Sequence, residues 1–164
     1  MPMNEIKKLD DVPRAKRRHE VLNAQYYDAV WYGTAEDIES LLEDGADVNY
    51  RGPGVSCGFQ RPPAYLVVRR NDRKKAELLV KHGLDVNARD EAGETALVFA
   101  LHEGAYETAI TLVKGGADLS VRDYRGRTPL ELAVADGWHG KKVARAIGLR
   151  VAIETVDMGE TDTP

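Results

Sequence analysis

The chain has little of the chemistry that builds disulfides, metal centres or membrane spans. Cys57 is the only cysteine among 164 residues, so an intramolecular disulfide and a four-cysteine zinc site are both excluded. No apolar run approaches the roughly 18 residues that a membrane-spanning helix needs, and residues 1–20 lack the apolar core of a signal peptide. We therefore expect a cytoplasmic protein, or a periplasmic or secreted one only if a signal peptide has been removed.

Catalytic side chains are equally scarce. The four histidines lie at positions 19, 82, 102 and 139, and no two are three or four residues apart on one helix face. Cys57 could act as a nucleophile only beside a base and an oxyanion site, and its glycine-rich loop favours an incidental thiol. The same stretch, RGPGVSCG, lacks the lysine and hydroxyl of a phosphate-binding loop. We expect no metal, no cofactor and no enzymatic activity.

What the chain does have is a repeated phrase. GADVN occupies residues 45–49, GLDVN 83–87 and GADLS 116–120, and the last two begin 33 residues apart. Thr95 and Thr128 keep the same spacing. Chance does not hold two such patterns in register, so the chain is built from structural repeats of about 33 residues.

Each repeat is predicted to contain two helices and an extended finger. In DYRGRTPLELAVADG, Thr128 is placed to cap a helix that begins at Pro129, and Leu130, Ala133 and Val134 share one helix face. A second helix follows, and the closing phrase leads into the next finger through turn-forming residues. Neither helix can bury its apolar side alone, so the repeats are expected to stack.

These residues resemble the ankyrin repeat. The family pattern of D-x-x-G-x-T-P-L-H-x-A-A-x-x-G followed by G-A-D-V-N is similar to DYRGRTPLELAVADG and to DEAGETALVFALHEG through GADLS, and the resemblance covers about residues 21–150. It implies an all-α solenoid of stacked helix-loop-helix units with projecting β-hairpin or finger loops. The family histidine is replaced by Tyr65, Val98 and Glu131, so its hydrogen-bond network with threonine is expected to be altered or missing.

The predicted organisation has six parts. They are a charged N-terminal extension (1–20), an N-capping repeat (21–50), a second repeat with a long finger insertion (51–89), a third repeat (90–122), a C-capping repeat (123–150) and an acidic, partly disordered tail (151–164). The insertion adds five residues, since Gly45 and Gly83 are 38 apart. It either reaches a partner or reflects neutral drift, which loops tolerate.

The resemblance implies protein binding through the finger tips and the concave ends of the first helices. The matching positions are Trp31, Tyr32, Phe59, Arg61, Arg69, Arg70, Arg89, Glu91, Glu94, His102, Glu103, Tyr124, Arg125 and Arg127. This set is rich in arginine and aromatics, the types that anchor interfaces. It predicts a basic groove, which Arg122 extends, although the chain as a whole carries a net charge of −4.

Several interpretations of these positions stay open. The arginines could be solvated, and a basic N-terminal segment could cover Trp31. We expect the partner to be a protein whose surface is acidic or of mixed charge, with an enzyme among the candidates. We expect this chain to be monomeric on its own. A small array without an effector domain favours an inhibitor or neutraliser of the immunity or antitoxin kind. A general adaptor is the alternative, and nucleic-acid binding is disfavoured because aromatics do not interleave with the arginines.

Overall fold

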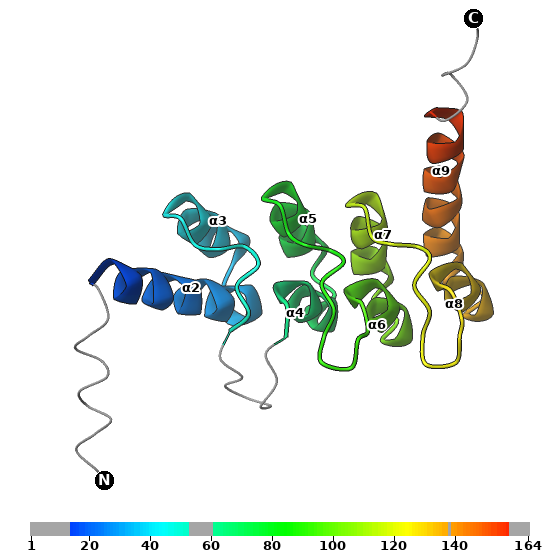
Figure 1. Ribbon diagram of the computed structural model, residues 1–164. Helices are drawn as coiled ribbons and strands as arrows, with labels where there is room; N and C mark the ends of the chain where they lie inside the picture. Colours follow the sequence, from blue (N-terminus) through cyan, green and yellow to red (C-terminus); the bar gives the residue numbers. More distant parts are fainter. Residues whose placement is uncertain (1–13, 53–60, 138, 158–164) are drawn as a thin grey trace, which may run out of the picture.

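The computed structural model describes residues 14–52, 61–137 and 139–157, and these fold into two rows of helices. The first helices are α2 (Arg14–Tyr32), α4 (Pro63–Arg70), α6 (Ala96–His102) and α8 (Pro129–Ala135). The second helices are α3 (Ala35–Glu43), α5 (Arg73–Lys81), α7 (Tyr106–Lys114) and α9 (Lys141–Asp157). Figure 1 shows the rows one above the other, with the loops that lead into α6 and α8 extending below the first helices. The predicted all-α solenoid is confirmed.

The fingers are hydrogen-bonded turns and not β-hairpins. Within the described ranges the only β-type pairing is an isolated antiparallel bridge between Arg89 and Thr95. None of the helices in those ranges is long and apolar enough to cross a membrane.

Helix starts follow the local sequence closely. Thr128 caps α8 as predicted: its hydroxyl accepts the Glu131 N–H, the Glu131 carboxylate accepts the Thr128 N–H, and Pro129 is the first helical residue. Thr95 occupies the same position before α6 but makes no capping bond, and its buried hydroxyl has no partner among the described residues. Glu131, which replaces the family histidine, is therefore what completes the cap of α8.

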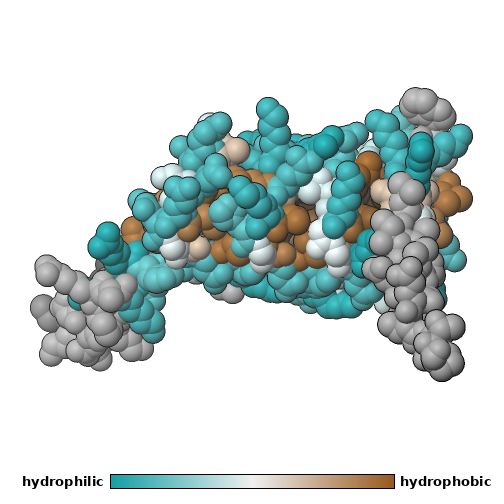
Figure 2. Space-filling view, turned by 90° about the horizontal axis from the view of Figure 1, so that it is seen from above, coloured by the Kyte–Doolittle hydropathy of each residue, from teal (hydrophilic) through white to brown (hydrophobic). Residues whose placement is uncertain are grey.

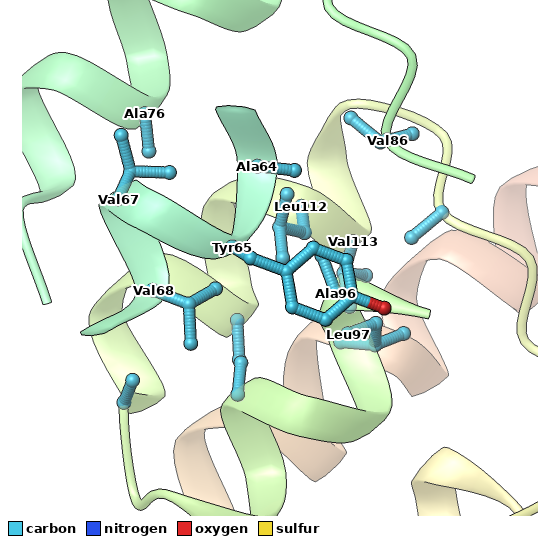
Figure 3. Packing of buried hydrophobic residues seen from close by; sticks show 14 of the residues in the cluster. Ala64, Tyr65, Val67, Val68, Ala76, Val86, Ala96, Leu97, Leu112 and Val113 are labelled. Atoms are coloured by element: carbon cyan, nitrogen blue, oxygen red, sulfur yellow. The ribbon is translucent and has the colours of Figure 1, made fainter. Parts of the chain in front are cut away.

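Two tyrosines bond a first helix to the loop before the next first helix, and one of them, Tyr65, stands where the family has histidine. Tyr65 is fully buried, and its hydroxyl donates to the Glu94 carbonyl at the base of the next finger. Figure 3 shows its ring among Ala96, Leu97 and other core residues. Tyr27 repeats this contact one unit earlier, with its hydroxyl 3.1 Å from the Arg61 carbonyl oxygen. The expected change in the histidine network thus takes the form of a bond from each tyrosine to the next repeat.

The closing phrases interlock through asparagine. The side-chain oxygen of Asn87 accepts the Asp118 N–H at 2.7 Å, and its amide nitrogen lies 3.3 Å from the Gly116 carbonyl. Asn49 makes the equivalent bonds to Asp85 and Gly83, at 2.7 and 3.2 Å. These asparagines therefore bind the next repeat and not only their own turn, which explains why the phrase recurs.

The interlock ends at Ser120, which replaces asparagine in the last closing phrase. Its hydroxyl instead donates to Asp118 in the same turn, at 2.7 Å. Beyond this point Arg150 of α9 donates to the carbonyls of Val113 and Ala117. The last helix thus supplies hydrogen bonds to the end of the third repeat.

Two predicted boundaries fall inside helices. α2 begins at Arg14, so residues 14–20 of the predicted extension are helical, because RAKRRHE contains good helix formers and no glycine or proline. α9 continues to Asp157, seven residues into the predicted tail, since VAIETVD also lacks a helix breaker.

Apolar residues run between the helices and stop at an open end. Seen from the side of the second helices, they form a band between projecting hydrophilic side chains (Figure 2). On α8 the predicted apolar face is only partly covered: Ala133 is buried, whereas Leu130 and Val134 are 45% and 62% exposed. The matching Leu97 of α6 is fully buried, because α8 follows it in the stack.

Candidate functional site: the concave face and its finger tips

The third and fourth fingers share one hydrogen-bonded design. The side chain of Asp90 accepts the backbone N–H groups of Ala92 and Glu94, and Asp123 accepts those of Arg125 and Arg127. Gly93 and Gly126 adopt φ of 78° and 79°, a left-handed conformation that glycine takes without strain. A D-x-x-G sequence therefore specifies a rigid tip that holds its neighbours in fixed directions.

Two arginine side chains fasten these finger tips by hydrogen bonds to backbone carbonyl groups. Arg89 donates from Nη1 to the Gly93 carbonyl, and Arg122 donates to the Gly126 carbonyl, both at 2.7 Å. Each guanidinium thus satisfies a carbonyl of its own finger. Although Arg89 and Arg122 are exposed, part of their hydrogen-bonding capacity serves the finger and not a partner.

A groove of about 490 Å³ lies between these two fingers and the end of α6. We call it the finger groove; its lining residues are Ala92, Gly93, Glu94, Phe99, His102, Glu103, Arg122, Asp123 and Tyr124. The structure therefore brings Glu94, His102, Glu103 and Tyr124 of the predicted set together.

Asp123 organises one wall of the finger groove. Its carboxylate is fully buried and lies 2.8 Å from Arg127 Nη2 and 3.4 Å from His102 Nε2. Burial alone would raise the pKa of Asp123, but hydrogen bonds from the Arg127 backbone and side chain and the Arg125 backbone outweigh it and lower the pKa to about 2. Asp123 is therefore ionised, and it takes up the charge of Arg127.

Glu94 has no such partner. Its carboxylate is half-buried, and no ion pair or side-chain hydrogen bond to it exists among the described residues. Burial is the main cause that raises the pKa of Glu94, and nearby Asp90 and Asp123 add to the increase, while His102 and Arg61 oppose it. The groove thus contains a carboxylate that is partly desolvated and not neutralised by contact.

Tyr124 stands at the outer edge of the finger groove. Its side chain is 77% exposed, its ring meets His102 edge-on at 5.8 Å, and the guanidinium carbon of Arg125 lies 5.2 Å from its ring centroid. An exposed aromatic ring beside a cation is the kind of side chain that anchors protein interfaces.

The other end of the concave face is built around Trp31. Arg70 of the second repeat stacks on the Trp31 ring at 5.4 Å and donates from Nε to the Trp31 carbonyl at 3.2 Å. Among the described residues, the cation that stacks on Trp31 is therefore Arg70 of the second repeat. Tyr32, 71% exposed, meets the Trp31 ring edge-on.

A second groove, also of about 490 Å³, lies beside Tyr32. Its lining residues are Tyr32, Gly33, Thr34, Ala35, Glu36, Arg70, Asp72, Lys74 and Lys75. Lys75 is buried and its ammonium donates to the Val30 carbonyl at 3.2 Å, so Lys75 ties α5 to the end of α2. Lys74 and Arg70 give this end of the face its positive charge.

Arg61 stacks inside the fold. Its guanidinium carbon lies 5.4 Å from the Phe99 ring and 5.9 Å from the Tyr65 ring. Phe59, predicted beside it on the long finger, lies outside the described residues. Arg69, Glu91, Glu103 and Arg125 are exposed.

The predicted basic groove is therefore divided. Arg61, Arg70, Arg89, Arg122 and Arg127 make contacts within the chain, and the finger groove is lined by three carboxylates and one arginine. Outside the finger groove, exposed basic side chains include Arg125 at its edge and Arg69, Arg70 and Lys74 at the other end of the face.

Sequence reasoning missed three residues that shape these grooves. The sequence pattern includes Asp123 only within DYRGRTPLELAVADG and Phe99 only within DEAGETALVFALHEG, and it predicts no role for Lys75. The conserved register of Asp90 and Asp123 within the chain was a usable signal for the finger design, whereas nothing in the sequence marks Lys75 as buried. Across the described positions no group of three or more His, Cys, Asp and Glu side chains is arranged to hold a metal ion.

Comparison with known proteins identifies the repeat. A family model for ankyrin repeats in three copies matches residues 26–123 and 64–147, which together span most of the chain. The chain matches none of the curated proteins with which it was compared. The helix pairs, the interlocked closing phrases and the family match agree, and the chain belongs to the ankyrin repeat family.

Proposed function

We propose that this protein binds one partner protein through its concave face and thereby inhibits or neutralises it. Ankyrin repeats are protein-interaction modules in general and are typically non-enzymatic. The observation that supports this use of the face is the pair of exposed tyrosines at its two ends, Tyr32 and Tyr124, each next to an arginine-bearing aromatic cluster.

The two ends differ in charge, which favours a partner of mixed charge. Arg69, Arg70 and Lys74 suit an acidic patch, whereas the finger groove presents Glu94 and Glu103. Opposite charges at two points fix the orientation of a partner and speed its encounter. A stack of this size can cover roughly 800 Å² on each side, enough for a standard interface.

We favour an inhibitory role over a scaffold because the described repeats present one continuous concave face, and we propose a cytoplasmic location and an enzyme as the target. An immunity or antitoxin protein works in this way, by covering a single surface. If the protein were a scaffold, affinity purification would recover several unrelated proteins with it.

Affinity purification from native cells tests the proposal. The variant Arg69→Glu/Arg125→Glu reverses charge at the basic end and removes the guanidinium that stacks on Tyr124, without touching an arginine that fastens a finger. Lys114→Glu/Arg145→Glu, on exposed positions of the second-helix row, is the matched control. We expect a single protein retained by wild type and control, lost by the first variant and inactive when bound. Many partners, or equal retention by all three chains, would contradict the proposal.

A further inference from the structure

The finger groove combines an aromatic wall with an unpaired carboxylate. Phe99 and Tyr124 line it, and Tyr124 is largely exposed. The electron-rich faces of such rings attract cations, most strongly where water is partly excluded.

Glu94 is the half-buried carboxylate of the groove that has no ion pair among the described residues, and Glu103, which also lacks one there, is exposed to solvent. Asp123 is neutralised by Arg127, and Arg122 donates to the Gly126 carbonyl of its own finger. Partial burial of an unpaired carboxylate costs free energy, as the raised pKa of Glu94 reflects. An incoming cation would recover that cost, whereas an incoming anion would increase it.

The chain itself shows which cation these rings accept. Arg61 stacks on Phe99, and Arg125 stacks on Tyr124, both from outside the residues that line the groove. A guanidinium is flat enough to lie on a ring while it donates two parallel hydrogen bonds to a carboxylate. The ammonium of lysine donates to a carboxylate as a point charge and lacks that planar fork.

We infer that the finger groove receives an arginine side chain of the partner protein, with Glu94 as its counter-ion and Tyr124 as its stacking surface. This inference rests on the proposed protein-binding function. His102 and Arg122 are the basic side chains that line the groove, Asp123 already pairs with Arg127, and exposed Glu103 adds negative charge at the rim.

The test uses a small probe and the full chain. N-acetyl-arginine N-methylamide is titrated into ¹⁵N,¹³C-labelled protein, with the citrulline compound as a neutral probe of the same shape. We expect saturable NMR shifts confined to residues 92–94, 99–103 and 122–124 with arginine only, together with a lowered pKa of the Glu94 carboxyl group. Glu94→Gln should weaken binding by about tenfold, because a charge-assisted pair is lost. Glu43→Gln, the same change on exposed α3, should stay within about twofold.

Each result bears on the inference. Equal binding of citrulline, absence of localised shifts, or unchanged affinity of Glu94→Gln would overturn it. The affinity purification separates this failure from failure of the proposed function: a partner lost by Arg69→Glu/Arg125→Glu but retained by Glu94→Gln would leave protein binding in place and remove the arginine from the groove.

Discussion

At the level of single residues, the Asp123 carboxylate holds the fourth finger in shape through hydrogen bonds and an ion pair. Its carboxylate receives backbone N–H groups from Arg125 and Arg127, the Arg127 guanidinium, and the edge of His102. Because these donors favour the ionised form, the folded-state pKa lies below the ordinary value of 3.8.

A pH-dependent loss of stability follows from that depressed pKa. A carboxyl group with a lowered folded pKa contributes stability that is complete above its unfolded pKa and is lost as pH falls through the folded value. We expect the carboxyl ¹³C signal of Asp123 to titrate near pH 2, and stability to decline between about pH 4 and 2. Asp123→Asn should flatten that decline in urea melts recorded across this range. An unchanged slope would show that Asp123 does not couple proton binding to folding.

Asn87 tests the interlock between repeats. Asn87→Ala removes two bonds to the next closing phrase and leaves the Asp118 N–H and the Gly116 carbonyl without their partner. We expect a loss of about 1–3 kcal/mol in the free energy of unfolding. Ser120→Ala, at the same repeat position, should cost no more than about 1 kcal/mol, because Ser120 bonds only within its own turn. Urea denaturation of both variants compares them directly, and equal costs would argue against the interlock.

At the level of elements, two helix starts with the same threonine behave differently. Thr128 closes a reciprocal cap with Glu131, whereas the buried hydroxyl of Thr95 has no hydrogen-bond partner in the part of the chain that the structure describes. The third helical residue is Glu131 in α8 and Val98 in α6, so only α8 has a side chain that can return the reciprocal bond to its threonine.

Thr128→Val and Thr95→Val should therefore change the stability of the protein by different amounts or in opposite directions. The first is expected to destabilise the protein by about 1 kcal/mol through loss of the cap. The second should be neutral or stabilising, because it replaces an unsatisfied hydroxyl by a methyl group of the same shape. Thermal unfolding measures both, and a comparable loss in Thr95→Val would mean that its hydroxyl has a partner in solution.

The elements were largely predictable and the site was only partly so. Helix starts such as Thr128–Pro129 depend on neighbouring residues, and the sequence displays them directly. The role of Arg70 depends on Trp31, which lies 39 residues earlier, and that of Arg127 on the burial of Asp123. Sequence spacing places these residues on one face, but it does not show which charges neutralise one another.

At the level of the whole molecule, the extensive contacts among the described helices run between neighbours in the stack. α6 packs on α4, α7 and α8, whereas α2 packs mainly on α3 and α4, with Lys75 of α5 bonded to its end. Stability in such an array is set by each repeat and its immediate interfaces.

Amide hydrogen exchange should be slowest in the middle of the stack and faster toward α2. We expect amides of α6 and α7 to exchange most slowly, because repeats on both sides must open before they are released. Amides of α2 before Tyr26 should exchange fastest among the helices, since few neighbours cover them. Mass spectrometry of peptic fragments resolves these segments, and uniform protection would indicate a single cooperative unit instead.

The exposed apolar face of α8 means that the stack could be extended at this end by a further repeat. Leu130 and Val134 present the surface on which another first helix would sit, and Ser120 is the only closing-phrase position that lacks the forward-reaching amide. A duplicated copy of residues 90–122, inserted after residue 122 with Ser120→Asn in the original repeat, would keep every joint of the array. The length of the binding face could then be set in steps of one repeat while both ends keep their native sequence.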